Sequence, residues 1–340
     1  MLSKKVPLYF SVISMFIGAA LVYIIFISFY KNSKQLRASV PSSVIEQSTA
    51  CDFNIVRLQG YHFVKPLLYN EQGCESSIYT PLKTEIGNLV ADLKNKGDVN
   101  IVSVYLRVFK QGTWMCYNPE ATFKPGSLLK IPVLLTFLKM TEDNPSLMNK
   151  EILFEHHNEK LPKQMITTKT LTPGHKYSMK ELIKYMIEYS DNDATALLES
   201  QINNKAFQQT FTDLGLISQT KDEKGAYLIG AKDYSIFLKV LYNASYLTIK
   251  DSEYATSLLA KSDFKDALAK GIPDKTELAH KFGESGNLKE HQLHDAGIVY
   301  INDMPYILTI MTKGSDLKKL SDAISKISKL VYDNLTENKN

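Results

Sequence analysis

The sequence is poor in cysteine, with three residues, Cys51, Cys74 and Cys116, among 340. Their spacing matches none of the short pairs that bind zinc or iron–sulfur clusters. Unpaired thiols that serve as small apolar residues are the simplest interpretation, and a Cys51–Cys74 disulfide stays open because an oxidising compartment would permit it. The seven histidines do not cluster either, since His291 and His294 lack a third ligand nearby. The sequence therefore predicts no metal site and no cofactor.

The sequence also lacks a block of charge of one sign. Its net charge of +4 is spread along the chain, and 22% of the residues are charged against 44% that are hydrophobic. This balance is typical of a globular protein and not of a disordered one. No motif that interleaves basic and aromatic residues for RNA or DNA is present, so we expect no nucleic-acid partner.

One long segment, Val6 to Tyr30, contains no charged residue. As a helix it would be about 37 Å long, more than the roughly 30 Å hydrocarbon core of a bilayer. A cleaved signal peptide would have a shorter apolar region and a small-residue cleavage site, so we interpret residues 6–30 as a retained single transmembrane helix. We divide the N-terminal part into a cytoplasmic tip with the anchor, residues 1–31, and a polar tether with an unassigned segment, residues 32–78.

The rest of the chain, residues 79–340, alternates between helical and strand patterns. Apolar residues at helical spacing predict helices over residues 80–95, 127–140, 179–188, 193–202, 231–241, 252–259 and 317–331. Alternating residues around turn signals predict two hairpins, 101–109 with 113–117 and 296–301 with 305–311, and residues 278–282 resemble a further strand. Two hairpins that far apart most simply join one antiparallel sheet. We therefore expect an α+β domain whose sheet is built from both chain ends, flanked by helices, with an all-helical subdomain beside it.

Three short motifs occur in order along this domain. Ser127 and Lys130 form a Ser-x-x-Lys pair at a predicted helix start, where a lysine made neutral by burial can activate a serine. Taken alone the pair means little, because Ser-x-x-Lys occurs five times in the sequence. Ser190-Asp191-Asn192 lies between two helices, where these residue types also favour a simple helix N-cap.

The third motif, Lys281-Phe282-Gly283, ends the strand-like segment ahead of the second hairpin. In that order and in those elements, the three motifs resemble the set found in class A β-lactamases and penicillin-binding proteins. The segment from Lys124 to Pro132 and the segment from Phe264 to Gly283 are similar to the corresponding regions of that family. The resemblance covers about residues 80–335 and implies a five-stranded antiparallel sheet.

The resemblance also implies roles for individual residues. Ser127 would attack a carbonyl and become acylated, and Lys130 would accept or relay its proton. Ser190 would pass a proton to the leaving nitrogen with the support of Lys281. Substrate binding would use the Asn192 side chain, the strand around Gly283 and Ser285, and an oxyanion hole formed by the backbone N–H groups of Ser127 and Glu284.

Two departures from the family pattern bear on activity. Phe282 replaces a threonine whose hydroxyl is expected to bind the substrate carboxylate, so affinity for ordinary β-lactams is expected to suffer. Residues 218–230 lack the Glu-x-x-Leu-Asn loop that supplies the deacylating glutamate, and Glu223 is the nearest carboxylate. Since a general base contributes typically about 10²–10⁴-fold, we expect slow turnover of the acyl-enzyme.

The sequence therefore predicts a membrane-anchored serine hydrolase or acyltransferase. Its expected partners are a β-lactam or a peptidoglycan-like peptide ending in D-Ala-D-Ala, and the membrane through residues 6–30. The catalytic domain should face outward from the cell membrane, where such substrates are met. The alternative is a non-catalytic, membrane-tethered binding or sensor domain that retains a β-lactamase-like pocket.

Overall fold

The computed structural model describes residues 52–162, 164–216, 220–222, 225–287, 290–302 and 304–337. Residues 51–340 belong to one compact unit. The predicted anchor, residues 6–30, lies outside the described residues. Across the ranges that are described, no helix combines the length and the apolar character needed to cross a membrane.

A five-stranded antiparallel sheet forms the centre of this unit, as the sequence predicts. Its strands follow the order β4-β3-β11-β10-β9. They span Ile101–Val108 (β3), Thr113–Tyr117 (β4), Glu277–Asn287 (β9), Glu290–Tyr300 (β10) and Tyr306–Gly314 (β11). The last strand in the order, β9, has no partner on its outer side in the described sheet, and it carries the Lys281-Phe282-Gly283 motif to that edge.

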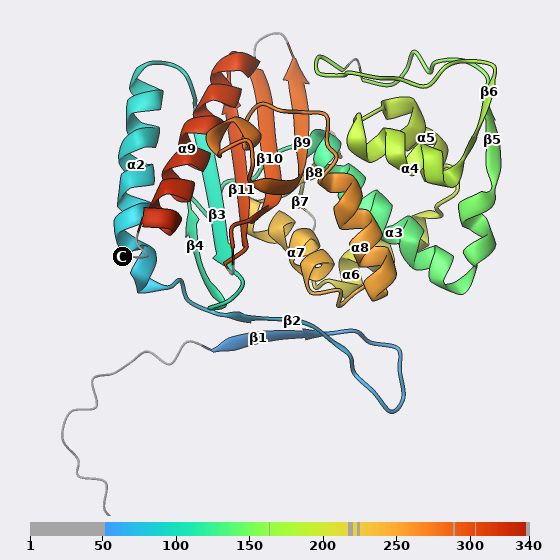
Figure 1. Ribbon diagram of the computed structural model, residues 1–340, viewed down its shortest axis with the longest axis horizontal. Coiled ribbons are helices and arrows are strands. Elements are labelled where there is room, and N and C mark those ends of the chain that lie inside the picture. The colour runs from blue at the N-terminus through green and yellow to red at the C-terminus, as the bar shows by residue number, and fades with distance from the viewer. Residues whose placement is uncertain are drawn as a thin grey trace, which may run out of the picture. The chain divides into compact units, whose positions relative to one another are not determined.

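Helices cover both faces of the sheet. On one face lie α2 (Thr80–Asn95) and α9 (Leu317–Glu337), side by side in Figure 1. Their buried apolar stripes, such as Leu82 and Ile86 of α2 and Ile324 and Ile327 of α9, form one core with the sheet. The other face packs against α7 (Ala231–Tyr242) and the helical subdomain. The two layers of helices leave the β9 edge next to the helical subdomain (Figure 1).

The helical subdomain lies between β4 and β9 in the sequence. It contains α3 (Lys130–Asp143), α4 (Met179–Glu188), α5 (Asn192–Glu199), α6 (Asn204–Asp213) and α8 (Ile249–Leu259). Short hairpins join these helices, β5 (Glu151–Phe154) with β6 (His175–Ser178), and β7 (Thr220–Lys221) with β8 (Tyr227–Leu228). The sequence did not indicate α6, because polar residues fill most of its ten positions and leave few apolar residues to mark a helix. Helix α4 has the predicted bounds, and α3, α5 and α8 lie where helices were predicted, with bounds shifted by up to three residues.

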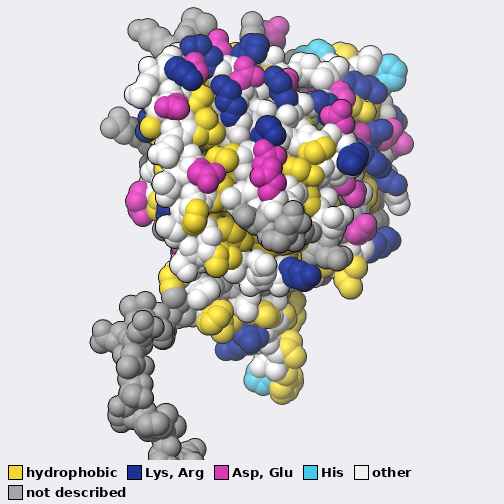
Figure 2. Space-filling model, turned by 60° about the vertical axis from the view of Figure 1, so that its left-hand side comes forward, with side chains coloured by type: hydrophobic (Ala, Val, Ile, Leu, Met, Phe, Trp, Pro, Cys, Tyr) yellow, Lys and Arg dark blue, Asp and Glu magenta, His cyan; other side chains and the backbone are white. Residues whose placement is uncertain are grey.

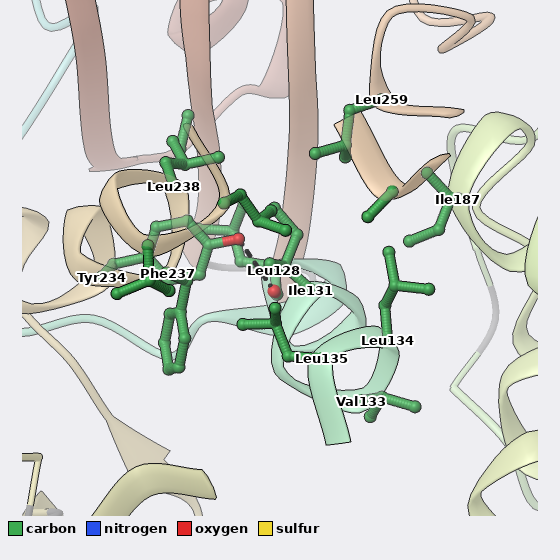
Figure 3. Close-up of a cluster of buried hydrophobic side chains, with 14 of the residues drawn as sticks. Leu128, Ile131, Val133, Leu134, Leu135, Ile187, Tyr234, Phe237, Leu238 and Leu259 are labelled. Carbon is green, nitrogen blue, oxygen red and sulfur yellow. Dashed lines mark hydrogen bonds between the residues drawn. The ribbon is translucent and has the colours of Figure 1, made fainter. Parts of the chain in front are cut away.

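Helix α3 is buried along nearly its whole surface, so it fixes the turn that precedes it. Its apolar side chains pack against α4, α7 and α8, as Figure 3 shows for Ile131, Leu134 and Leu135. The Tyr234 hydroxyl of α7 donates a hydrogen bond to Leu128 O (2.9 Å). The prediction that Ser127 opens the α-helix is wrong in detail. Ser127 lies in a 3₁₀ turn, Gly126–Leu129, and the α-helix begins at Lys130.

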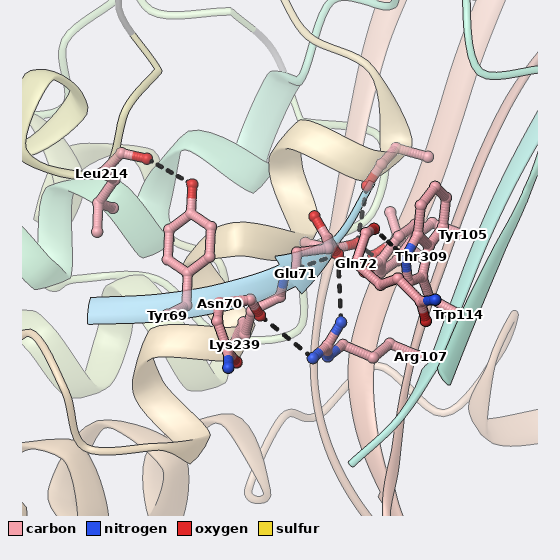
Figure 4. A network of polar contacts seen from close by, with 12 residues as sticks. Tyr69, Asn70, Glu71, Gln72, Tyr105, Arg107, Trp114, Leu214, Lys239 and Thr309 are labelled. Atoms are coloured by element: carbon pink, nitrogen blue, oxygen red, sulfur yellow. Dashed lines mark hydrogen bonds and ion pairs between the residues drawn. The ribbon is translucent and has the colours of Figure 1, made fainter. Parts of the chain in front are cut away.

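Residues 53–72, which the sequence left unassigned, form a hairpin of β1 (Phe53–Arg57) and β2 (Leu67–Gln72). A buried polar network joins β2 to the domain (Figure 4). Glu71 Oε1 accepts hydrogen bonds from Tyr105 (2.6 Å), Lys239 (2.8 Å) and Arg107 (3.3 Å). Burial opposes ionisation of Glu71, but Lys239, the Tyr105 phenol and the nearby charge of Lys232 together keep its pKa below the ordinary value. The carboxylate therefore stays charged and ties β2 to β3 and α7.

The outer part of this hairpin is apolar and exposed. Phe63 is 93% exposed and Phe53 63%, with Ile55, Tyr61 and Val64 each more than half exposed. Figure 2 shows hydrophobic side chains gathered on the projection at the bottom of the view, which lies at the level of the β1–β2 hairpin in Figure 1. Exposed apolar patches of this kind mark interaction surfaces more often than scattered single residues do.

The cysteines divide into two kinds. Cys116 is a free, buried thiol, and burial raises its pKa to about 12, so it behaves as an apolar residue. Cys74 is disulfide-bonded. The interpretation of all three cysteines as unpaired is therefore wrong for Cys74. Its predicted partner, Cys51, lies outside the described residues.

Candidate active site

Ser127 lies in a turn that is clamped to the sheet through the backbone of Lys124. Lys124 N donates to Gln292 Oε1 (2.9 Å), and Lys124 O accepts from His294 Nε2 (3.0 Å) and Ser285 Oγ (3.1 Å). His294 Nδ1 accepts a backbone N–H of β11, so Nε2 carries the proton. Burial lowers the pKa of His294 to about 4, which keeps the imidazole neutral near pH 7. Ser285, predicted to bind substrate, thus helps to hold the turn that contains Ser127.

Two glycines allow β9 to approach this turn closely. Gly126 has a φ of +54°, and a Cβ added to it would lie 2.1 Å from Glu284 O and 3.2 Å from Glu284 N. A Cβ on Gly283 would lie 2.4 Å from Pro125 O. Backbone atoms cannot yield as a flexible side chain can, so both positions require glycine. The glycine of Lys281-Phe282-Gly283 therefore allows β9 to contact the turn that contains Ser127, and it brings the Glu284 backbone close to that turn.

The hydroxyl of Ser190 lies between two lysines from different elements. Lys281 Nζ is 2.8 Å from Ser190 Oγ and Lys130 Nζ is 3.1 Å from it. Lys130 Nζ also donates to Ser190 O and to Asn192 Oδ1 (2.9 Å). Among the described residues, no hydrogen bond joins Lys130 to Ser127 Oγ. The three motifs of the sequence thus meet at the Ser190 hydroxyl, close to the turn that contains Ser127.

Both lysines are held toward the neutral form. Burial lowers the pKa of Lys130 to about 7, against the opposing effect of Asp191, Glu284 and Glu199. Burial, together with the nearby charge of Lys130, lowers the pKa of Lys281 well below its ordinary value. Two ammonium groups on one hydroxyl would repel each other, which agrees with this direction. A neutral lysine has a lone pair that can accept a proton, as nucleophile activation requires.

Ser190-Asp191-Asn192 is both a helix cap and part of the site. Asp191 is the N-cap of α5, with its side chain accepting from Ala194 N (2.5 Å) and from Leu171 N (3.3 Å). Ser190 has a φ of +60°, a left-handed conformation that non-glycine residues seldom adopt. Strained backbone of this kind clusters at functional sites. The simpler interpretation as a cap is therefore correct for Asp191, while Ser190 and Asn192 face Lys130.

A cavity of about 250 Å³ opens beside Ser127 and Lys130. Asn192, Glu199 and Glu284 also line it. Lys281, Gly283 and Ser285, named from the sequence, support the site from the β9 side and do not line this cavity. Glu199 was missed by the sequence reasoning. Its position seven residues after Asn192 on one helix was the available signal, because residues two turns apart share a face.

Phe282 points away from this cavity. Its ring is 4% exposed and lies tilted against the ring of Phe264, with 4.2 Å between ring centroids, in the core that includes α9. Lys281 Nζ lies 4.1 Å from the centroid of the Phe282 ring. The replacement of threonine removes a hydroxyl, as the sequence predicts, but the ring neither lines nor fills the cavity. Glu223, the nearest candidate for a deacylating base, lies outside the described residues.

The fold combines an antiparallel sheet with a helical subdomain. In the site, the turn that contains Ser127 lies near two buried lysines and the Ser190 hydroxyl. Together these features define a serine hydrolase of the penicillin-recognising class. The model of the beta-lactamase enzyme family matches residues 81–335. The chain belongs to this family, and it is a serine hydrolase of the β-lactamase type. No curated protein matches the sequence.

Solved structures share the fold at low sequence identity. PBP-A is 20% identical, with a TM-score of 0.63 over 76% of this chain and 97% of that chain. A mutant of PBP-A, solved as an acyl-enzyme complex with penicillin G, gives the same values. The class A β-lactamase from Mycobacterium abscessus is 17% identical, with a TM-score of 0.63 over 75% of this chain and 99% of that chain. Identities this low show the fold alone.

Proposed function

We propose that the protein forms an acyl-enzyme on Ser127 with a β-lactam or a peptide ending in D-Ala-D-Ala. The observation that carries this proposal is the Ser190 hydroxyl between Lys130 and Lys281 Nζ, beside the cavity that Ser127 lines. Solved relatives with this fold include an acyl-enzyme complex with penicillin G. Site geometry and fold together favour acyl transfer over simple binding.

In the proposed reaction, neutral Lys130 accepts the proton of Ser127 as Oγ attacks the carbonyl carbon. The backbone N–H groups of Ser127 and Glu284 stabilise the negative charge that forms on the carbonyl oxygen. The C–N bond then breaks, and the leaving nitrogen takes a proton from Ser190 Oγ. Lys130, 3.1 Å from that oxygen, returns the proton it took, so the serine proton ends on the leaving nitrogen. Lys281 holds Ser190 in place from the other side.

We expect acylation to be faster than hydrolysis of the acyl-enzyme. The family's glutamate loop is absent from residues 218–230. Of the carboxylates that line the cavity, Glu284 accepts backbone N–H groups with one oxygen, and Glu199 has no hydrogen bond to Ser127 or Lys130 among the described residues. The expected slow turnover therefore rests on the missing loop, and Glu199, which lines the same cavity as Ser127, is the carboxylate to test as a hydrolytic base. Slow turnover favours a penicillin-binding or peptidase-like role over efficient β-lactam hydrolysis.

We further propose that residues 6–30 anchor the protein in the cell membrane with the catalytic domain outside. The uncharged segment, the disulfide at Cys74 and the apolar surface of the β1–β2 hairpin support this placement. A reporter enzyme fused after Asn340 should be active only outside the cytoplasm. A reporter that is active only in the cytoplasm would contradict the placement.

Labelling with a fluorescent penicillin tests the acylation. The wild-type protein should form a stable covalent adduct, and Ser127→Ala should form none while it retains the thermal unfolding midpoint of the wild type. An adduct on Ser127→Ala would show that another residue is the nucleophile. A wild type that binds the reagent only reversibly would support the alternative, a non-catalytic sensor.

A further inference from the structure

A short segment, Gln164–Ile166, is hydrogen-bonded to two walls of the candidate active site and is called the crossing segment below. One wall is Ser190-Asp191-Asn192, and the other is the outer edge of β9. On the first wall, the Gln164 side chain donates to Ser190 O and accepts from Asn192 N (3.3 Å). Gln164 is thereby held to the same residue that carries the proton-relay hydroxyl.

On the second wall, the side chain of Glu284 holds the same segment. Glu284 Oε1 accepts the backbone N–H groups of Met165 (2.8 Å) and Ile166 (3.2 Å). Hydrogen bonds to a carboxylate are stronger than neutral ones. Ile166 packs against the core that contains Phe264 and Phe282. The segment is thus attached at both walls. Glu284 lies 118 positions after Ile166 and 119 positions after Met165 in the sequence.

The amide that should receive the substrate is already in use. Asn192 Oδ1 accepts from Lys130 (2.9 Å), and Asn192 Nδ2 donates to Pro162 O (3.0 Å), just before the crossing segment. If Asn192 positions the acyl side chain, as the family resemblance implies, an acyl donor with a large amide side chain has to displace one of these contacts. A slender donor needs only the carbonyl-binding N–H groups and Ser127.

The side chain of Glu284 is unfavourable for stability alone. Its second oxygen, Oε2, is buried with no hydrogen-bond partner among the described residues. A buried carboxylate oxygen without a partner destabilises the folded state. A residue kept at such a position is better explained by a contribution to the site that it lines.

We propose that Glu284 and Gln164 are specificity-determining residues that hold Gln164–Ile166 across the cleft. The closed segment admits slender acyl donors and slows bulky ones, which acylate Ser127 only after the segment is displaced. This inference rests on the proposed acylation of Ser127. Glu284 would thus have two roles. Its backbone N–H would stabilise the oxyanion, and its side chain holds Met165 and Ile166 by hydrogen bonds.

Hydrogen–deuterium exchange tests the attachment without relying on catalysis. In the full-length protein, the Met165 and Ile166 amides should exchange at least about tenfold faster in Glu284→Ala than in the wild type, with Glu284→Gln between them. Glu290→Gln is the matched control, because it neutralises a carboxylate on the neighbouring strand that pairs with Lys313. Unchanged exchange in Glu284→Ala would overturn the role of Glu284.

Acylation rates test the effect on specificity. The reagents are p-nitrophenyl acetate, a slender ester, and a fluorescent penicillin with a bulky side chain, each measured against Ser127→Ala as the blank. The ratio of bulky to slender rate constants should rise at least about tenfold in Glu284→Ala and in Gln164→Ala, and should not rise in Glu290→Gln. Gln164→Ala keeps the test valid if the Glu284 variant does not fold.

The outcomes separate this inference from the proposed function. If neither reagent acylates the wild type through Ser127, the proposed function fails. If both do, and the ratio stays within about twofold of the wild type in the two variants, the segment does not determine specificity.

Discussion

Lowering the pH from 8 to 6 should slow the acylation of Ser127 about tenfold. The reason is the pKa of about 7 that burial gives Lys130. With that value the neutral fraction of Lys130 falls from about 0.9 at pH 8 to about 0.1 at pH 6, and only the neutral amine can accept the serine proton. An ordinary lysine, with a pKa of about 10.4, would be neutral to only about 0.04% at pH 7. Burial therefore raises the usable fraction about a thousandfold.

The direction of the pH effect on the acylation rate follows from the fact that the neutral form of Lys130 is the active one. The rate should rise with pH through the pKa of Lys130 and level off above it. Stability follows the same direction, because the folded state binds fewer protons at Lys130 than the unfolded chain does between about pH 7 and the ordinary lysine pKa. The contribution of Lys130 to the free energy of unfolding therefore increases with pH across that window. The acylation rate at each pH has to be measured well below the unfolding temperature, so that a loss of activity is not caused by unfolding.

The assay is the acylation rate constant for p-nitrophenyl acetate between pH 5.5 and 8.5, with Ser127→Ala as the blank. Glu199 raises the pKa of Lys130, so Glu199→Gln should move the rising limb to lower pH and speed acylation at pH 6. Glu85→Gln, a charge removal on α2, should leave the limb in place. A rate that is flat over this range would refute the assignment of Lys130 as the proton acceptor.

Three further predictions follow from the packing and the site. Gly283→Ala should reduce acylation at least about a hundredfold and lower the free energy of unfolding by about 1–3 kcal/mol, since its Cβ meets Pro125 O at 2.4 Å; Gly87→Ala, with 3.5 Å to its nearest neighbour, should not destabilise. Glu71→Gln should cost about 3 kcal/mol in urea unfolding by leaving buried cations unpaired, whereas Glu75→Gln breaks a surface pair and should cost less than about 1 kcal/mol. Hydrolysis of a chromogenic β-lactam should show a burst followed by slow turnover, and burst-free hydrolysis abolished by Glu223→Gln would contradict this.

The sequence predicts the sheet and the motif-bearing elements because their signals are local. Strand alternation, the turns between strands, and caps such as Asp191 depend on residues a few positions apart. The three motifs were informative in combination, and the structure brings Ser190, Lys130 and Lys281 within hydrogen-bond distance. The start of α3 was misplaced by three residues because apolar periodicity does not distinguish a 3₁₀ turn from the first turn of an α-helix.

Contacts between distant segments could not be predicted in the same way. Glu71 meets Lys239 at a sequence separation of 168 residues, and nothing near Glu71 in the sequence marks it as buried. The attachment of Met165 to Glu284 spans 119 residues. The face of β9 on which the Phe282 side chain lies could not be predicted either, because a motif gives the residue type at a position and not the direction of its side chain.

The dual use of Ser190-Asp191-Asn192 explains how this site can hold a strained residue. Ser190 lies in the left-handed region, which is unfavourable for a serine. Asp191 offsets this by capping α5 and by accepting Leu171 N. In this left-handed conformation the Ser190 hydroxyl lies between the two lysines. The carbonyl oxygen of Ser190 accepts hydrogen bonds from Lys130 and Gln164. One short turn carries the cap, the Ser190 hydroxyl and an attachment point of the crossing segment, so the proposed proton transfer and the proposed control of substrate access would be linked through Ser190.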